Sequence, residues 1–176
     1  MNELAERRPM MVDKDELVEL LRQWGVSHAE EWAEQELRDE HFAVLAMFRF
    51  LRPLQHMLDG YLYGSEYWVQ QTIERKDPTA EVLKEMIDAG IAPEKIGWFA
   101  YWIAREAINA VLYRLDDPAG GDYDLPNEGE GLPSWSLQER IEHREGTKWT
   151  AELTGRVIGG MHTLFPFHNP EDKKME

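Results

Sequence analysis

The residues best suited to chemistry lie inside an otherwise apolar segment. Arg105, Glu106 and Asn109 interrupt residues 97–112, whose other side chains are almost all apolar or aromatic. Burying unpaired charge costs free energy, so these groups should form ion pairs with a neighbouring helix or, alternatively, form the polar floor of an aromatic pocket for a small ligand. The ion-paired core is the favoured interpretation. The candidate ligand-binding residues are Trp98, Tyr101, Trp102, Arg105, Glu106, Asn109 and His162.

The sequence predicts neither a metal site nor a cofactor. Its six histidines lack the Glu-x-x-His spacing of di-metal bundles and the His-Glu-x-x-His spacing of zinc proteases. Glu36 and Glu40 share a helical face, and Asp122 and Asp124 are calcium-type oxygen ligands, but a solvated acidic surface is the simpler interpretation of both. The chain has no cysteine, which excludes disulfides and thiolate metal sites. These features favour a binding or structural protein over an enzyme.

Negative charge is concentrated in two segments of the chain. Residues 13–40 hold ten acidic and three basic residues, and residues 116–145 hold nine acidic and two basic residues. Each segment therefore has a net charge of −7, out of −15 for the whole chain. Such surfaces disfavour nucleic acids and anionic membranes and favour a basic protein partner. The candidate partner-binding residues are Glu30, Glu31, Glu34, Asp122, Asp124, Glu128 and Trp135.

Apolar residues recur mostly at helical spacing, which predicts a mainly α fold. Pro53 should end or kink the helix that contains it, because proline removes a backbone donor. The segment 93–115 carries apolar side chains almost all round, as expected of a central helix packed on several sides. Residues 135–141 fit either a strand or a helical turn. Helices are expected at residues 14–24, 27–53, 54–62, 66–75, 78–90, 93–115 and 148–165.

The expected organisation is a single-domain bundle of six or seven helices. Residues 13–166 form this domain, residues 1–12 a flexible arm and residues 167–176 a frayed tail. A long acidic loop rich in glycine and proline follows the apolar helix, with a short β-hairpin near residues 133–148 as the alternative there. We see no signal peptide and no apolar run long enough to span a bilayer, which predicts a soluble, cytoplasmic protein.

Three functions fit these features. The favoured function is a protein-interaction module, of the inhibitor, immunity or regulatory kind, that acts on a basic partner, and the other two are alternatives to it. The second is a small-molecule-binding protein or enzyme whose pocket contains Arg105 and Glu106. The third is a structural subunit, for example a homodimer that buries an apolar helix face. The overall pattern resembles small bacterial helical proteins without identifying a family.

Overall fold

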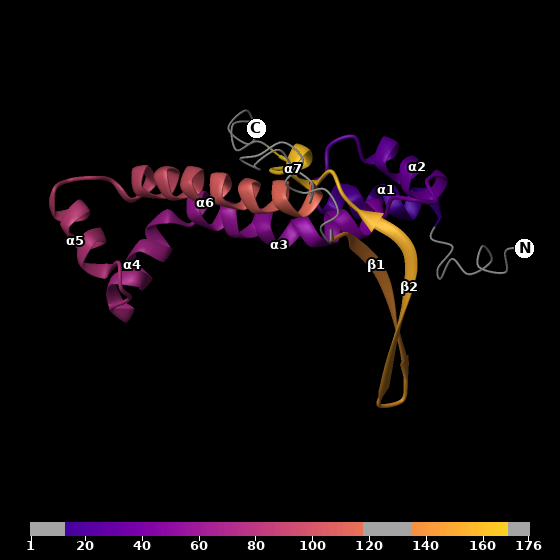
Figure 1. The fold of residues 1–176 in the computed structure, drawn as a ribbon. Helices are drawn as coiled ribbons and strands as arrows, with labels where there is room; N and C mark the ends of the chain where they lie inside the picture. Colours follow the sequence, from indigo (N-terminus) through magenta and orange to yellow (C-terminus); the bar gives the residue numbers. More distant parts are fainter. Residues whose placement is uncertain (1–12, 118–134, 169–176) are drawn as a thin grey trace, which may run out of the picture.

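The computed structural model describes residues 13–117 and 135–168 (Figure 1). These residues form a mainly helical fold with one two-stranded antiparallel sheet, which confirms the predicted fold class. The predicted arm at residues 1–12 and most of the predicted acidic loop lie outside the described residues. The helices are α1 (Lys14–Gln23), α2 (Ala29–Arg38), α3 (Val44–Tyr63), α4 (Ser65–Arg75), α5 (Ala80–Asp88), α6 (Pro93–Asp116) and α7 (Met161–Leu164), and the strands are β1 (Leu137–Glu145) and β2 (Lys148–Ile158).

Two long helices, α3 and α6, run side by side in opposite directions and form the length of the molecule (Figure 1). Helices α4 and α5 lie at one end, whereas α1, α2, α7 and the base of the hairpin gather at the other. The main core lies at the second end, where Phe48, Leu51 and Met161 are almost completely buried. A smaller core of Val69, Leu83 and Ile96 joins α4, α5 and α6.

The chain remains packed two residues beyond the predicted domain boundary at 166. The ring of Phe167 meets the ring of Phe48 edge-on, at a centroid distance of 5.8 Å. The Nε2 atom of His168 lies 3.1 Å from the carboxylate of Asp59 on α3. The predicted tail from residue 169 onwards lies outside the described residues. None of the described helices combines the length and apolar character needed to cross a membrane.

The prediction for residues 27–62 is wrong in its helix boundaries. The first helix ends at Arg38, because Asp39 Oδ1 accepts the backbone N–H groups of His41 (2.8 Å) and Phe42 (3.1 Å) in a tight turn. Helix α3 then begins at Val44 and continues through Pro53 to Tyr63. The helix therefore does not end at Pro53, which is one of the two outcomes expected there.

The predicted helix at residues 148–165 is also wrong. Its first part is strand β2, which pairs with β1 around a turn where Gly146 has φ +62°. Trp149 and Leu153 are four residues apart and therefore share a face in a helix as well as in a strand, and the pairing with β1 decides between them. The only helix retained from this prediction among the described residues is the single turn of α7.

Candidate interaction surface

One face of α6 is apolar and exposed to solvent. Phe99, Ile103 and Val111 expose 62%, 58% and 59% of their surface, and Trp102 is also exposed. Their spacing of three, four or eight residues places them on one side of the helix. We call this surface the α6 stripe, and it comprises Phe99, Trp102, Ile103, Ala107, Ala110 and Val111.

The opposite face of α6 is buried against α3, α4 and α7. Ile96, Tyr101 and Leu112 lie in this contact. At Gly97 helix α6 approaches α4 so closely that a Cβ atom added to this glycine would lie 2.5 Å from Ser65 Cβ. The prediction that this helix packs on several sides is therefore wrong, because the described residues cover only one face of α6. Glu106 is also exposed on this side of α6, between Ile103 and Ala110, so one carboxylate interrupts the apolar surface. An exposed apolar surface of this size is typical of a binding surface.

The predicted aromatic residues on α6 contact one another and form a cluster. The rings of Trp98, Tyr101 and Trp102 have centroid distances of 5.8 to 6.0 Å. Burial raises the pKa of Tyr101 above its usual value of 10, although the positive charge of Arg105 acts in the opposite direction. The structure therefore brings these three predicted residues together.

Arg105 is held by an aromatic ring and not by a carboxylate. Its guanidinium carbon lies 4.5 Å from the ring centroid of Trp102, a cation–π contact. Among the described residues no ion pair to Arg105 occurs, which makes the favoured prediction of a salt-bridged core wrong. Its Nε atom and Asn109 Oδ1 are buried without a hydrogen-bond partner within the described parts of the chain, whereas Glu106 is exposed.

His162 lies at the far end of α6 from the aromatic cluster. Its Nδ1 atom is 2.8 Å from Asp116 Oδ2, and the same oxygen accepts the backbone N–H of His162. Asp116 is fourteen residues beyond Trp102, which corresponds to about 20 Å along a helix. The structure therefore separates His162 from the other predicted ligand-binding residues, and the contact with Asp116 joins α7 to α6.

Two cavities lie away from the aromatic cluster. One, of about 210 Å³, lies between α2, α3 and β2, with Trp32, Phe42 and Met47 in its wall. The other, of about 560 Å³, is lined by Trp24, Arg49, Arg52, Pro53 and His56. Neither contains a predicted ligand-binding residue. Across residues 13–117 and 135–168, no three His, Asp or Glu side chains gather in a way that would hold a metal ion.

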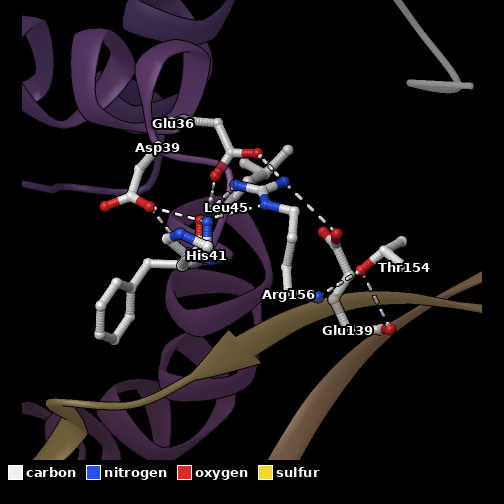
Figure 2. A network of polar contacts seen from close by, with 8 residues as sticks. Glu36, Asp39, His41, Leu45, Glu139, Thr154 and Arg156 are labelled. Carbon is white, nitrogen blue, oxygen red and sulfur yellow. Dashed lines mark hydrogen bonds and ion pairs between the residues drawn. The ribbon is translucent and has the colours of Figure 1, made fainter. Parts of the chain in front are cut away.

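Arg156 on β2 fixes the base of the hairpin to the helices (Figure 2). Its Nη1 atom donates hydrogen bonds to Glu36 Oε1 (2.7 Å) and Glu139 Oε2 (3.3 Å), and its Nε and Nη2 atoms donate to the Phe42 carbonyl oxygen. The other carboxylate oxygen of Glu36 accepts the Leu45 N–H at 2.9 Å. Sequence reasoning missed this site, since no spacing pattern links residues 120 positions apart.

These contacts of Arg156, which we call the joint of the hairpin, also determine the pKa of the arginine. Burial has the largest single effect on the pKa of Arg156 and acts to lower it. The ion pairs with Glu36 and Glu139 together outweigh burial, so the pKa lies above its usual value. A short backbone pairing reinforces the joint, because Val157 N–H donates to the His41 carbonyl oxygen and Ala43 N–H donates to that of Val157.

Beyond this joint the two strands project away from the helices as a ribbon (Figure 1). The register places Trp149, Ala151 and Leu153 on one face of the ribbon. Their partners on β1 are Arg144, Glu142 and Arg140, respectively. Trp149 and Leu153 expose 61% and 65% of their surface. An isolated two-stranded ribbon is only marginally stable in water, so this exposed ribbon is a second candidate for contact with a partner.

The predicted acidic partner-binding residues on α2 point outward, but each has a basic neighbour. Glu30 contacts Arg22, Glu31 Oε1 lies 3.6 Å from His28, and Glu34 Oε2 lies 3.7 Å from Lys14. The pKa of Glu30 is lowered by a backbone hydrogen bond first and by Arg22 second. Trp135 is half-exposed, and its indole N–H donates to the Arg114 carbonyl oxygen at 3.1 Å. Asp122, Asp124 and Glu128 lie outside the described residues.

Comparison of the chain with protein-family models, curated proteins and solved structures finds no match. Function therefore has to be inferred from geometry. Within the described residues, the exposed α6 stripe and the exposed ribbon are features that a stable helical fold does not itself require.

Proposed function

We propose that this protein is an assembly subunit that binds a second copy of itself through the α6 stripe. The carrying observation is that Phe99, Ile103 and Val111 are each more than half exposed on one side of a helix whose other side is packed. Each such side chain contributes about 2 kcal/mol when it is fully removed from water. Burial of the stripe in an interface would stabilise the dimer by this free energy, because these side chains remain exposed in the described fold.

The charge distribution favours a second copy at this surface. Residues 99–111 contain one arginine and one glutamate, so the stripe is locally neutral in a chain with net charge −15. Contact through the acidic helices α1 and α2 would instead bring like charges together. These helices lie at one end of the molecule (Figure 1), so an antiparallel pairing of two α6 helices keeps the acidic ends of the two copies apart.

The sizes of the side chains also favour an antiparallel pairing. The N-terminal half of the stripe holds the large residues Phe99, Trp102 and Ile103, whereas the next positions, Ala107 and Ala110, are small. A twofold axis near residues 106–107 places Ile103 of one helix opposite Ala110 of the other and Trp102 opposite Val111, with Glu106 opposite Ala107 at the axis. Large side chains facing small ones allow two helices to interdigitate closely.

Measurement of molar mass in solution tests the proposal. We expect the full chain to have twice its 20.6 kDa mass by light scattering, and the variant Ile103→Glu/Val111→Glu to have the monomer mass. The matched control is Val82→Glu on α5, which replaces a similarly exposed apolar residue outside the stripe and should remain dimeric. Circular dichroism confirms that each variant is folded. A wild-type chain that stays monomeric at every concentration tested contradicts the proposal.

An electrostatic contact with a basic protein is the second candidate function. It is supported by the three ion pairs of Glu30, Glu31 and Glu34, whose side chains are mostly exposed. Exposed pairs of this kind contribute about 0–1 kcal/mol, so a basic partner can replace them at little cost. The triple change of these residues to glutamine should abolish capture of a basic host protein at low salt while leaving the dimer intact. Capture that is unchanged by the substitutions, or by raising the salt, counts against this function.

A further inference from the structure

We propose that the cavity between α1 and α3 binds a small phosphate ester. Its wall is formed by Trp24 at the end of α1 and by Arg49, Arg52, Pro53 and His56 on α3, around a volume of about 560 Å³. The cavity is an open surface groove, because Arg49, Arg52, Pro53 and His56 are exposed to solvent and Trp24 is only partly buried. The proposal concerns a different face from the α6 stripe and does not depend on self-association.

Three basic side chains converge on this cavity from one helix. Arg49, Arg52 and His56 are three and four residues apart, which places them on the same side of α3. Within residues 13–117 and 135–168, none of the three forms a hydrogen bond or an ion pair with another side chain. Such a cluster is unusual here, because the chain has 34 acidic and only 19 basic residues and others, such as Arg22 and Arg156, do pair with carboxylates. A bound anion would relieve the mutual repulsion of the cluster.

Trp24 holds one of these arginines in position. The guanidinium carbon of Arg52 lies 5.5 Å from the Trp24 ring centroid, a cation–π contact that restricts the side chain without using its N–H donors. Those donors therefore remain available to bind oxygen atoms in a forked geometry. The indole ring, which is only partly buried, provides an apolar surface for the organic part of a ligand.

The charge of the cavity favours phosphate over a single carboxylate. A phosphate monoester carries about −1.5 to −2 charges near neutral pH and presents three acceptor oxygens. Two arginines that remain charged, with a histidine beside them, match that charge and number of acceptors. The organic group of the ester would then lie against Trp24 and Pro53.

Nuclear magnetic resonance of the full chain tests this site at constant ionic strength. Inorganic phosphate should shift the indole N–H signal of Trp24, assigned with Trp24→Phe, along a saturating curve. Phenyl phosphate should bind at least threefold more tightly than inorganic phosphate, because its ring contacts the indole. Malonate, the dicarboxylate control, should bind at least fivefold more weakly than phenyl phosphate.

Substitutions localise the response to the cavity. Arg52→Gln should weaken phenyl phosphate binding at least tenfold, and Arg49→Gln provides the same test if the first variant does not fold. Arg38→Gln, which removes one positive charge from the end of α2, should change the affinity less than twofold. The assignment would be overturned by a non-saturating shift, by preference for malonate, or by variants Arg52→Gln and Arg49→Gln that bind phenyl phosphate as tightly as the unsubstituted chain does. The Ile103→Glu/Val111→Glu variant should still bind, which separates this result from the test of assembly.

Discussion

The guanidinium of Arg156 lies against the carboxylate of Glu36, with Nη1 2.7 Å from Oε1, and this contact joins strand β2 to helix α2. Both side chains are largely buried. Glu36 also accepts the N–H of Leu45, so one carboxylate links the hairpin to the start of α3. This ion pair, together with the backbone hydrogen bonds of Val157 to His41 and Ala43, therefore sets the orientation of the projecting ribbon.

Loss of this joint should destabilise the protein strongly. Arg156→Gln leaves the carboxylates of Glu36 and Glu139 without their shared partner, and we expect the free energy of unfolding to fall by about 2–4 kcal/mol in urea denaturation. Arg140→Gln is the control, because it removes an exposed ion pair with Glu142 on the same ribbon and should cost less than about 1 kcal/mol. Equal losses in the two variants would contradict a special role for Arg156.

The turn that separates α2 from α3 should weaken in acid. Hydrogen bonds from the backbone N–H groups of His41 and Phe42 hold the pKa of Asp39 below its ordinary value of 3.8. A lowered folded-state pKa means that this carboxylate contributes stability above the unfolded-state pKa, and that the contribution is lost as the pH falls through the folded-state pKa. Asp39→Ala should therefore lower the urea midpoint at pH 7 and have a much smaller effect well below pH 3.8. Glu85→Ala, an exposed acid on α5, should show no such pH-dependent difference.

Two glycines on the paired long helices should respond oppositely to the same substitution. At Gly97 an added methyl group would collide with the Tyr61 carbonyl oxygen and lie 2.5 Å from Ser65 Cβ, whereas at Gly60 it would meet no atom within 4 Å. We expect Gly97→Ala to lower the free energy of unfolding by at least about 2 kcal/mol, since the contact includes backbone that cannot move aside. Gly60→Ala should raise it by up to about 1 kcal/mol through helix propensity. Thermal denaturation measures the change in stability of both variants. Stabilisation by Gly97→Ala would show that α6 packs less closely against Tyr61 and Ser65 than described.

The proposed antiparallel pairing of α6 can be tested by disulfide formation, because the chain contains no cysteine. A mixture of Ile103→Cys and Ala110→Cys proteins should give a crosslinked heterodimer under mild oxidation, with little crosslinking of Ile103→Cys alone. A parallel pairing would reverse this result, since each residue would then face its own copy. Val82→Cys on α5 measures the background from random collision.

Sequence patterns located most helices because helix formation depends on residues three and four positions apart. The expected helices at residues 14–24, 66–75 and 93–115 agree closely with α1, α4 and α6. The absence of cysteine and the placement of acidic residues were also fixed by sequence, and the carboxylates of Glu30, Glu31 and Glu34 do point outward.

Tertiary structure decided the features on which the proposals depend. Trp149 and Leu153 share a face in a helix as well as in a strand, and pairing with β1 made their segment a strand. The apolar surface all round α6 indicated a central helix, but the number of neighbours a helix has is a property of the whole arrangement and not of its own residues. The contact of Arg156 with Glu36 and the convergence of Trp24 with Arg52 join residues that lie far apart in the chain, and only folding brings such groups together.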